Sequence, residues 1–553
     1  MKPIVVAAGA TILCLAGLAF ATPASAQGAF FAPFNAPVPV FSKALAFDVS
    51  RPLRSLPRSI GTTPFSQFGV EIRPENDEGP FVRPVNIFRD PVVQRFAGND
   101  SSDRLLLTFE GLSNSQNPFQ VVPPDSDGTI GKNNYVEIVN LVFGDYDRQG
   151  HLLAGPTQLG TLWTGFPISD CTDNSGDPVA LYDRKNDRWV LTQFTTRGPN
   201  YYNCVAVSQT GDPAGSYYRY AFSAGPNFPD YPKYGDWSDS YLLTSRDFGN
   251  NGSYGISVYG LEKKKMVLGD PNARSVHFFL DSSKVPIATI GDGLLPADVD
   301  GKLPADGAPA PVVGTQNILG PYGATSDALN IYNLTVNWPH GTSSLSALIQ
   351  LPVATFNSTF PCGASGRACI PQPNTTAKVD FLGYRQRPTW RLAFRKRTGY
   401  DVMVTNQSVQ VSPGVAGVRW YEIRRTHNVY SLFQQGTYAP SDNVDRWMGS
   451  AAMDKFGNIA LGYSVSDATS TFPGIRYTGR KPTDPPGMMT LREKVMKAGT
   501  GSQTTSFNRW GDYSSLNIDP LDDCTFWYVN EYYQTTSIEG WQTRIGSFKL
   551  KGC

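Results

Sequence analysis

The sequence predicts an all-β protein, a seven-bladed β-propeller whose ring is closed by strands from both ends of the chain. Gly and Pro are abundant, with 53 and 43 residues, while aromatic residues make up 12% and charged residues only 17% of the 553 positions. This composition is typical of many short strands joined by turns. Pairs of strand-like runs joined by acidic turns also recur along the chain. Their spacing is near or above the roughly 40 to 50 residues of a four-stranded blade.

The first 26 residues have the form of a signal peptide. Lys2 is followed by an apolar run from Ile4 to Phe20 and by the small-residue site Ala24-Ser25-Ala26. No later stretch reaches the roughly 20 apolar residues of a spanning helix. We therefore expect a protein that is secreted, periplasmic or at the cell surface, with no transmembrane segment.

Residues 27–104 are predicted to form an irregular, Pro-rich extension that partly wraps the main domain. Alternation of apolar and polar residues is weak there, as in Arg51-Pro52-Leu53-Arg54. Leu105–Phe109 is the first convincing strand, so the propeller domain is assigned to residues 105–553.

The clearest repeat lies at Arg509–Val529, where a strand, the acidic turn Asp519–Asp523 and an aromatic strand follow one another. Each such sheet is amphipathic, so neighbours are expected to pack around a central axis. The last repeat supplies three strands, and Leu105–Phe109 is expected to add the fourth and close the ring. Two packed β-sandwich domains are the alternative. The seven repeats are marked by Asp125, Asp177, Asp230, Asp298, Trp390, Trp447 and Gly511.

One short helix is predicted in a loop over one rim, within Pro485–Ala498. Leu491, Val495 and Ala498 follow one another at helical spacing.

The cysteines indicate disulfides. Of seven cysteines, Cys14 lies in the leader. An even number then remains in an exported chain, which favours three disulfides over a metal site. Order along the chain favours Cys171 with Cys204, Cys362 with Cys369, and Cys524 with Cys553.

Charge and motifs exclude several classes of function. With 48 Lys and Arg against 47 Asp and Glu, the chain offers no overall field for nucleic acid. The four histidines are scattered, and neither a zinc-protease motif, a nucleophile elbow nor a dinucleotide fingerprint occurs.

Short motifs stand out between Pro123 and Tyr513. They resemble those of a family of exported bacterial proteins of unknown function that look like propellers. The resemblance covers about Leu105 to Cys553, implies a propeller fold and transfers no catalytic residue. The motifs are Pro123-Pro124-Asp125-Ser126-Asp127-Gly128, Gly176-Asp177-Pro178-Val179, Asp230-Tyr231-Pro232-Lys233, Arg419-Trp420-Tyr421-Glu422, Arg446-Trp447-Met448-Gly449-Ser450, Ile475-Arg476-Tyr477-Thr478-Gly479-Arg480 and Arg509-Trp510-Gly511-Asp512-Tyr513.

The candidate ligand site lies in the C-terminal third. Arginines beside aromatic residues there are candidates to converge at the channel mouth and hold an anion through forked hydrogen bonds. In the alternative, each arginine stacks on its aromatic neighbour and pairs with an acidic turn to lock adjacent blades. The residues are Arg419, Arg446, Arg476, Tyr477, Arg480 and Arg509.

Acidic turns are candidate Ca²⁺ ligands. Carboxylate oxygens suit this ion, although such residues also cap turns through bonds to the backbone. The candidates are Asp125, Asp127, Asp298 and Asp300.

The leading hypothesis is an exported propeller that binds a carbohydrate, peptide or cell-surface partner at its channel mouth. The alternative is a sialidase-like glycoside hydrolase in which arginines bind an anionic sugar and Tyr477 is the nucleophile. A purely structural surface protein is a third hypothesis. The sequence leaves binding and catalysis open.

Overall fold

The structure is a computed structural model. It describes residues 37–59, 61, 88–118, 120–250, 252–359, 368–381, 386–504 and 508–553, with the backbone of two short strands, β1 (Phe30–Phe31) and β4 (Val70–Glu71). The all-β prediction is confirmed, since within these residues α-helix is confined to α1 (Lys263–Leu268) and α2 (Ile287–Ile290). No described helix is long and apolar enough to cross a membrane. The expected leader, residues 1–26, lies outside the described residues.

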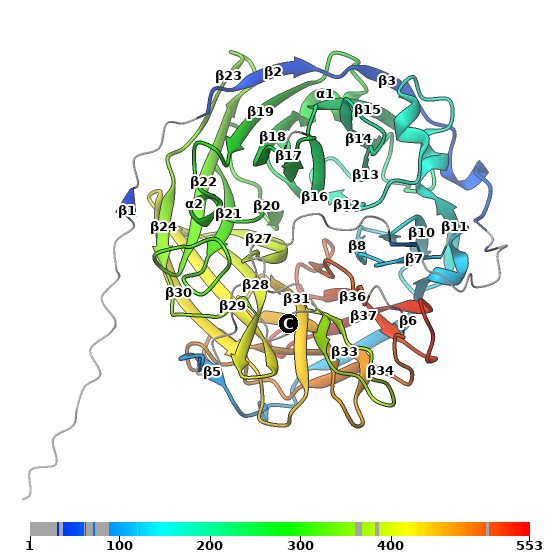
Figure 1. The fold of residues 1–553 in the computed structure, drawn as a ribbon. Helices are drawn as coiled ribbons and strands as arrows, with labels where there is room; N and C mark the ends of the chain where they lie inside the picture. Colours follow the sequence, from blue (N-terminus) through cyan, green and yellow to red (C-terminus); the bar gives the residue numbers. More distant parts are fainter. Residues whose placement is uncertain are drawn as a thin grey trace, which may run out of the picture.

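Three antiparallel sheets follow one another in the first half of the chain, each built from strands in chain order (Figure 1). The acidic hairpin repeats therefore fold locally, as their turn residues indicate. The first sheet contains β8 (Asp127–Ile130), β9 (Asn134–Val139), β10 (Val142–Asp147) and β11 (Leu152–Gln158). The second contains β12 (Ala180–Asp183), β13 (Arg188–Phe194), β14 (Tyr201–Ser208) and β15 (Tyr217–Gly225). The third contains β16 (Phe228–Asp236), β17 (Ser240–Phe248), β18 (Tyr254–Glu262) and β19 (Arg274–Asp281).

The next two groups form one larger sheet, because their first strands, β20 and β27, pair in parallel. Within each group the pairing is antiparallel. One group contains β20 (Leu295–Asp300), β21 (Ala310–Gln316), β22 (Ala328–Asn337), β23 (Thr342–Leu345) and β24 (Ile349–Pro352). The other contains β27 (Thr389–Arg397), β28 (Tyr400–Ser412), β29 (Val415–Thr426) and β30 (Val429–Tyr438).

The last two sheets use the C-terminal part of the chain. One contains β31 (Asp445–Met453), β32 (Ile459–Ser466), β33 (Phe472–Arg480) and β34 (Lys494–Gly499). The other contains β35 (Ser515–Ile518), β36 (Phe526–Tyr533), β37 (Trp541–Lys549) and, from far earlier in the chain, β6 (Arg104–Ser113). The strand expected at Leu105–Phe109 thus pairs with the C-terminal repeat.

The first strands of these groups lie side by side around the middle of the molecule (Figure 1). Contacts run from β8 through β12, β16, β20, β27 and β31 to β35, and β35 contacts β8. We call these strands the inner strands. Aromatic side chains fill the space between neighbouring sheets, as where the rings of Trp237 and Phe394 lie 4.9 Å apart and those of Tyr477 and Phe548 lie 3.9 Å apart.

Strands from the N-terminal extension cover the outer edges of several sheets. β2 (Val40–Lys43) pairs with β19, and β3 (Ala46–Val49) with β15, along the rim in Figure 1. β1 pairs with β24, and β5 (Val93–Gln94) with β30. Two small sheets lie apart from these, β4 with β7 (Val121–Val122) and β25 (Ala368–Ile370) with β26 (Val379–Asp380).

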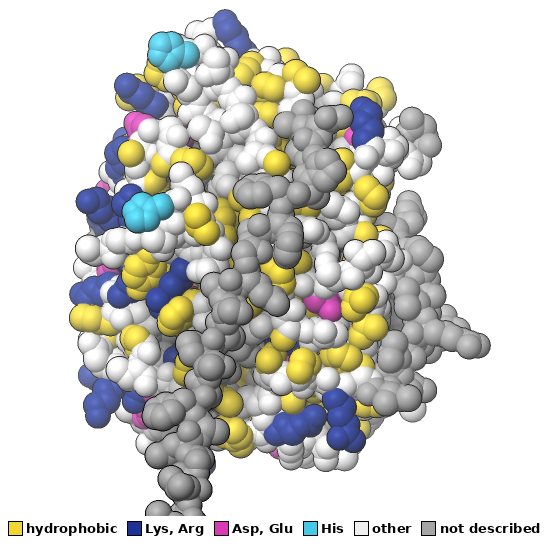
Figure 2. Space-filling model, turned by 90° about the vertical axis from the view of Figure 1, so that its left-hand side faces the viewer, with side chains coloured by type: hydrophobic (Ala, Val, Ile, Leu, Met, Phe, Trp, Pro, Cys, Tyr) yellow, Lys and Arg dark blue, Asp and Glu magenta, His cyan; other side chains and the backbone are white. Residues whose placement is uncertain are grey.

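The surface on the side of β24 is mixed in character. Figure 2 shows Lys and Arg side chains gathered along its left-hand margin, and hydrophobic side chains in small groups among polar ones.

Two predicted disulfides are confirmed. Cys171 is bonded to Cys204 and Cys524 to Cys553, with Cα atoms 6.0 and 5.8 Å apart. Cys369 is disulfide-bonded as well, and Cys362 lies outside the described residues.

The predicted helix within Pro485–Ala498 is wrong. The segment carries β34, which is the outermost strand of its sheet and pairs antiparallel with β33. Met496 is buried while Val495 is exposed, the alternation of a strand. Pairing with a free sheet edge therefore outweighs the helical spacing.

Buried ion pairs join neighbouring inner strands. Arg391 on β27 donates to Asp298 at 2.7 Å and to Asp300 at 2.9 Å, both on β20. Burial opposes the charge of Asp300, yet Arg391 and Arg184 hold its pKa below the usual value. Arg391 is thus the shared counter-ion of two buried carboxylates.

We expect Arg391→Met to lower the free energy of unfolding by about 3–5 kcal/mol, because it leaves two buried carboxylates without their shared cation. Urea unfolding followed by tryptophan fluorescence measures this loss. Arg104→Met removes the same charge from an exposed residue and should cost less than about 0.5 kcal/mol. Equal losses in the two variants would contradict the assigned role.

Candidate functional site

Two of the six predicted site residues meet. Arg446 lies 2.7 Å from one oxygen of Glu493, and Arg476 lies 2.8 Å from the other. The Tyr463 hydroxyl also donates to Glu493, at 2.7 Å. The two guanidinium groups therefore share an internal carboxylate.

The other four residues lie in different surroundings. Arg419 pairs with Asp90 at 2.8 Å, and Arg480 donates to backbone carbonyls of the loop that follows it, among them that of Asp484. Arg509 pairs with Asp512 at 2.9 Å, and the Tyr477 hydroxyl donates a hydrogen bond to Asp103 at 2.8 Å. Each of the six side chains thus has a partner within the protein.

The predicted Ca²⁺ ligands also bind protein groups. Asp298 and Asp300 share Arg391, as described above. Asp127 accepts a hydrogen bond from the Ala180 N–H at 2.9 Å, and burial raises its pKa to about 6. Asp125 accepts two hydrogen bonds, from the Asp512 N–H at 2.7 Å and from Asn140 at 2.9 Å.

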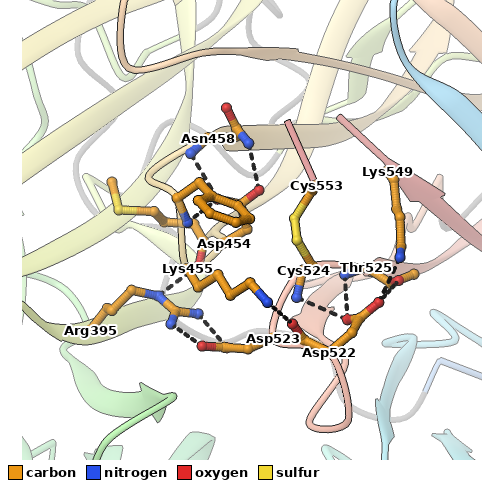
Figure 3. Close-up of a disulfide and its surroundings, with 12 residues drawn as sticks. Arg395, Asp454, Lys455, Asn458, Asp522, Asp523, Cys524, Thr525, Lys549 and Cys553 are labelled. Atoms are coloured by element: carbon orange, nitrogen blue, oxygen red, sulfur yellow. Dashed lines mark hydrogen bonds and ion pairs between the residues drawn. A yellow bond between two sulfur atoms is a disulfide. The ribbon is translucent and has the colours of Figure 1, made fainter. Parts of the chain in front are cut away.

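One group of three potential metal ligands lies close together among the described residues, Asp454 with Cys524 and Cys553. The two cysteines are joined in the disulfide of Figure 3, so they offer no thiolate. Around the disulfide, Lys549 pairs with Asp522 at 2.9 Å and Arg395 with Asp523 at 2.6 Å. These contacts hold the acidic turn between β35 and β36 in place.

A second region, of which the sequence singled out Asp125 alone as a candidate ligand, surrounds Lys233. Its ammonium lies 3.5 Å from the ring centre of Tyr231 and 4.0 Å from that of Tyr513, and it donates to the Pro232 carbonyl at 3.0 Å. Lys233 has no exposed surface. A cation between two aromatic faces is stabilised by both rings when water is excluded.

Carboxylates from three other chain segments complete this region. We call Lys233, Tyr231, Tyr513, Asp125, Asp177 and Asp512 the axial cluster. Its members lie on β16 or just before β8, β12 and β35, so they belong to the starts of four inner strands. Side chains distant in sequence are thus brought together.

Hydrogen bonds connect the cluster from strand to strand. Asn140 donates to Asp125 at 2.9 Å and accepts from the Asp177 N–H at 2.9 Å. The Tyr231 N–H in turn donates to Asp177 at 3.2 Å. The network thus fixes the positions of the carboxylates relative to one another.

Three residues of the cluster have a left-handed backbone. Asp125, Asp177 and Tyr231 have φ of +49°, +43° and +51°. This conformation is unfavourable for side chains other than Gly, and strain of this kind concentrates at binding and catalytic sites. It turns the chain sharply just before, or within, the inner strand.

Burial perturbs the charges of the cluster. It lowers the pKa of Lys233 to about 8, against the attraction of Asp177 and Asp125. Burial and the neighbouring Asp512 raise the pKa of Asp125 to about 7, and burial with Asp125 raises that of Asp177. The pKa values of Asp125 and Lys233 therefore lie close to neutral pH. Such perturbation is frequent at functional sites.

Comparisons with known proteins give no family. No family model and no curated protein matches the chain. Similar solved structures include the endo-arabinase from Bacteroides thetaiotaomicron, at 14% identity over 57% of this chain and 95% of that one, with a TM-score of 0.28. The polysaccharide lyase Uly1 has 10% identity over 82% and 100%, with a TM-score of 0.35. The phage phi92 endosialidase has 6% identity over 84% and 69%, with a TM-score of 0.32. Likeness this slight transfers neither fold nor activity.

We expect Lys233→Met to change the pH dependence of stability. The folded-state pKa of Asp125 and Asp177 lies above the unfolded value, so their contribution is full below about pH 4 and is lost as pH rises through the folded pKa, about 7 for Asp125. Removing the cation raises both pKa values further, which extends the loss above pH 7.

Unfolding midpoints in urea at pH 5, 7 and 9 test this. Lys233→Met should lose more stability between pH 7 and 9 than the wild type. Lys264→Met, at an exposed lysine, is the matched control and should follow the wild-type profile. Parallel profiles for Lys233→Met and the wild type would show that the lysine does not set the titration of the carboxyls.

Proposed function

We propose that the protein is an exported seven-bladed β-propeller that binds a carbohydrate, peptide or cell-surface partner where its inner strands begin. The seven strand groups in the described residues, six of four strands and one of five, support the blade count. Contact between β35 and β8, with β6 completing the last sheet, supports a closed ring. The leader-like N-terminus and two disulfides support export.

One observation carries the binding site: Lys233 lies between two tyrosine rings at the meeting point of four inner strands, amid carboxylates of perturbed pKa. For stability alone, apolar residues of similar volume would serve at least as well. The left-handed backbone at Asp125, Asp177 and Tyr231 adds a further cost that a purely structural core does not need. A binding role for the axial cluster explains why the protein keeps both the buried charges and the strained backbone.

A glycoside hydrolase is the second candidate. Burial and Asp512 raise the pKa of Asp125 to about 7, and Asp512 beside it pairs with Arg509 at 2.9 Å. Glycoside hydrolysis uses two carboxyl groups, one of them an acid with a raised pKa. The sialidase-like form of this hypothesis needs three of the predicted arginines to converge on the sugar carboxylate, whereas each of them has the internal partners described above.

The binding proposal predicts that Lys233→Met weakens ligand binding at least about tenfold, because the buried ammonium holds the tyrosine rings and carboxylates of the cluster in place. An array of neutral and anionic oligosaccharides and of peptides identifies the ligand, and calorimetry gives the dissociation constant. Lys264→Met should bind like the wild type, and circular dichroism checks that each variant is folded. Unchanged binding by folded Lys233→Met would refute this site.

The hydrolase candidate predicts turnover of aryl glycosides that Asp125→Asn abolishes while binding persists. Turnover lost in Asp125→Asn would favour the enzyme, and binding with no turnover the binding module. If the wild type shows neither binding nor turnover, the hypothesis that remains is a purely structural surface protein.

A further inference from the structure

A groove with a different character lies between the sheet of β27–β30 and the sheet of β31–β34. It encloses about 320 Å³, part of it open to solvent. Its walls include Arg397, Tyr400, Arg424, Phe433 and Gln434. Arg397 and Met453 end β27 and β31, so the groove lies at the opposite ends of the inner strands from the axial cluster.

One wall of the groove is a rigid aromatic platform. The Arg424 guanidinium lies 3.1 Å from the ring centre of Phe433 and 4.7 Å from that of Tyr400. Glu422 fixes this guanidinium at 2.8 Å and also accepts from Gln434 at 2.6 Å. Phe433 is nevertheless 48% exposed. The platform is thus held by internal contacts and still presents ring surface to a ligand.

Arg397 differs from the other guanidinium groups of this region. Within the described part of the chain it pairs with no carboxylate, and it donates to the Met453 sulfur at 4.0 Å. By contrast, Arg395 pairs with Asp523, and Arg424 with Glu422. A half-buried guanidinium without a carboxylate can bind an external one through two parallel hydrogen bonds.

The backbone opposite leaves room for this side chain. Gly457 has φ of +92°, and a Cβ there would lie 3.3 Å from the Arg397 Nη1 atom. A side chain at this position would therefore crowd the guanidinium. Gly457 allows the loop after β31 to approach Arg397 closely.

We infer that this groove binds a saccharide that carries a carboxylate, such as a uronate. Arg397 binds the carboxylate, and the exposed face of Phe433 packs against the sugar ring. Gln434 donates or accepts a hydrogen bond at a sugar hydroxyl, and the Glu422 carboxylate accepts one. This site is independent of the axial cluster.

Calorimetry with trigalacturonate at low salt tests the inference, with maltotriose as the neutral probe and hexaglutamate as the acidic peptide. We expect trigalacturonate to bind, maltotriose to bind at least tenfold more weakly, and added salt to weaken the uronate complex. Binding of hexaglutamate as tight as that of trigalacturonate, or no binding of trigalacturonate, would overturn the assignment.

Matched variants locate the site. Arg397→Gln should raise the dissociation constant at least tenfold, and Arg397→Lys should fall between it and the wild type, since lysine keeps the charge but not the fork. Lys396→Gln removes an exposed charge from the adjacent position and should bind like the wild type. Unchanged binding by Arg397→Gln would refute the role of this residue.

Two further variants separate the alternatives. Phe433→Ala should weaken trigalacturonate binding several-fold if the ring packs on the sugar. If Phe433→Ala binds as the wild type does, the groove holds an anion without recognising a saccharide, which overturns the proposal. Lys233→Met should retain uronate binding. The proposal for the axial cluster and the proposal for the groove can therefore be refuted independently.

Discussion

Sheet edges are the constraint on which this structure depends. Every outer strand carries backbone N–H and C=O groups that need partners, and an uncovered edge invites pairing with another chain. The chain covers several of these edges with its own N-terminal segment, through β1, β2, β3 and β5, and completes the last sheet with β6. A long extension with little core of its own is stable because the sheets it covers are already formed.

Ion pairs and hydrogen bonds connect the N-terminal extension to the sheets that it covers. Asp90, in the extension, is fully buried against Arg419 and also accepts from Thr437 at 2.7 Å. Asp103 likewise accepts from Tyr477. Such pairs add little net stability when both partners are desolvated, but breaking one leaves an uncompensated charge. They therefore fix which strand lies against which edge, so the extension has a single register.

Local sequence patterns predicted the strands but not most residues of the two proposed sites. The runs at 401–406 and 459–464 contain consecutive apolar residues and are bounded by turn residues, and they became β28 and β32. The helical spacing within Pro485–Ala498 was equally local but was overridden by pairing with β33. The role of Lys233 could not be recognised, because Tyr513, Asp125, Asp177 and Asp512 come from segments that only the tertiary fold brings close to it.

The distinction between structural and functional charges follows from their partners. Arg446 and Arg476 share Glu493, and Arg391 neutralises two carboxylates, so these cations are satisfied inside the protein. Lys233 is outnumbered by carboxylates that compete for protons, and Arg397 has no carboxylate among the described residues. Binding energy for an external ligand is available where internal pairing is incomplete, because a satisfied pair must first be broken. The sequence pattern of arginines beside aromatics selected the satisfied group, whereas the incomplete pairing became visible only once the strands were assembled.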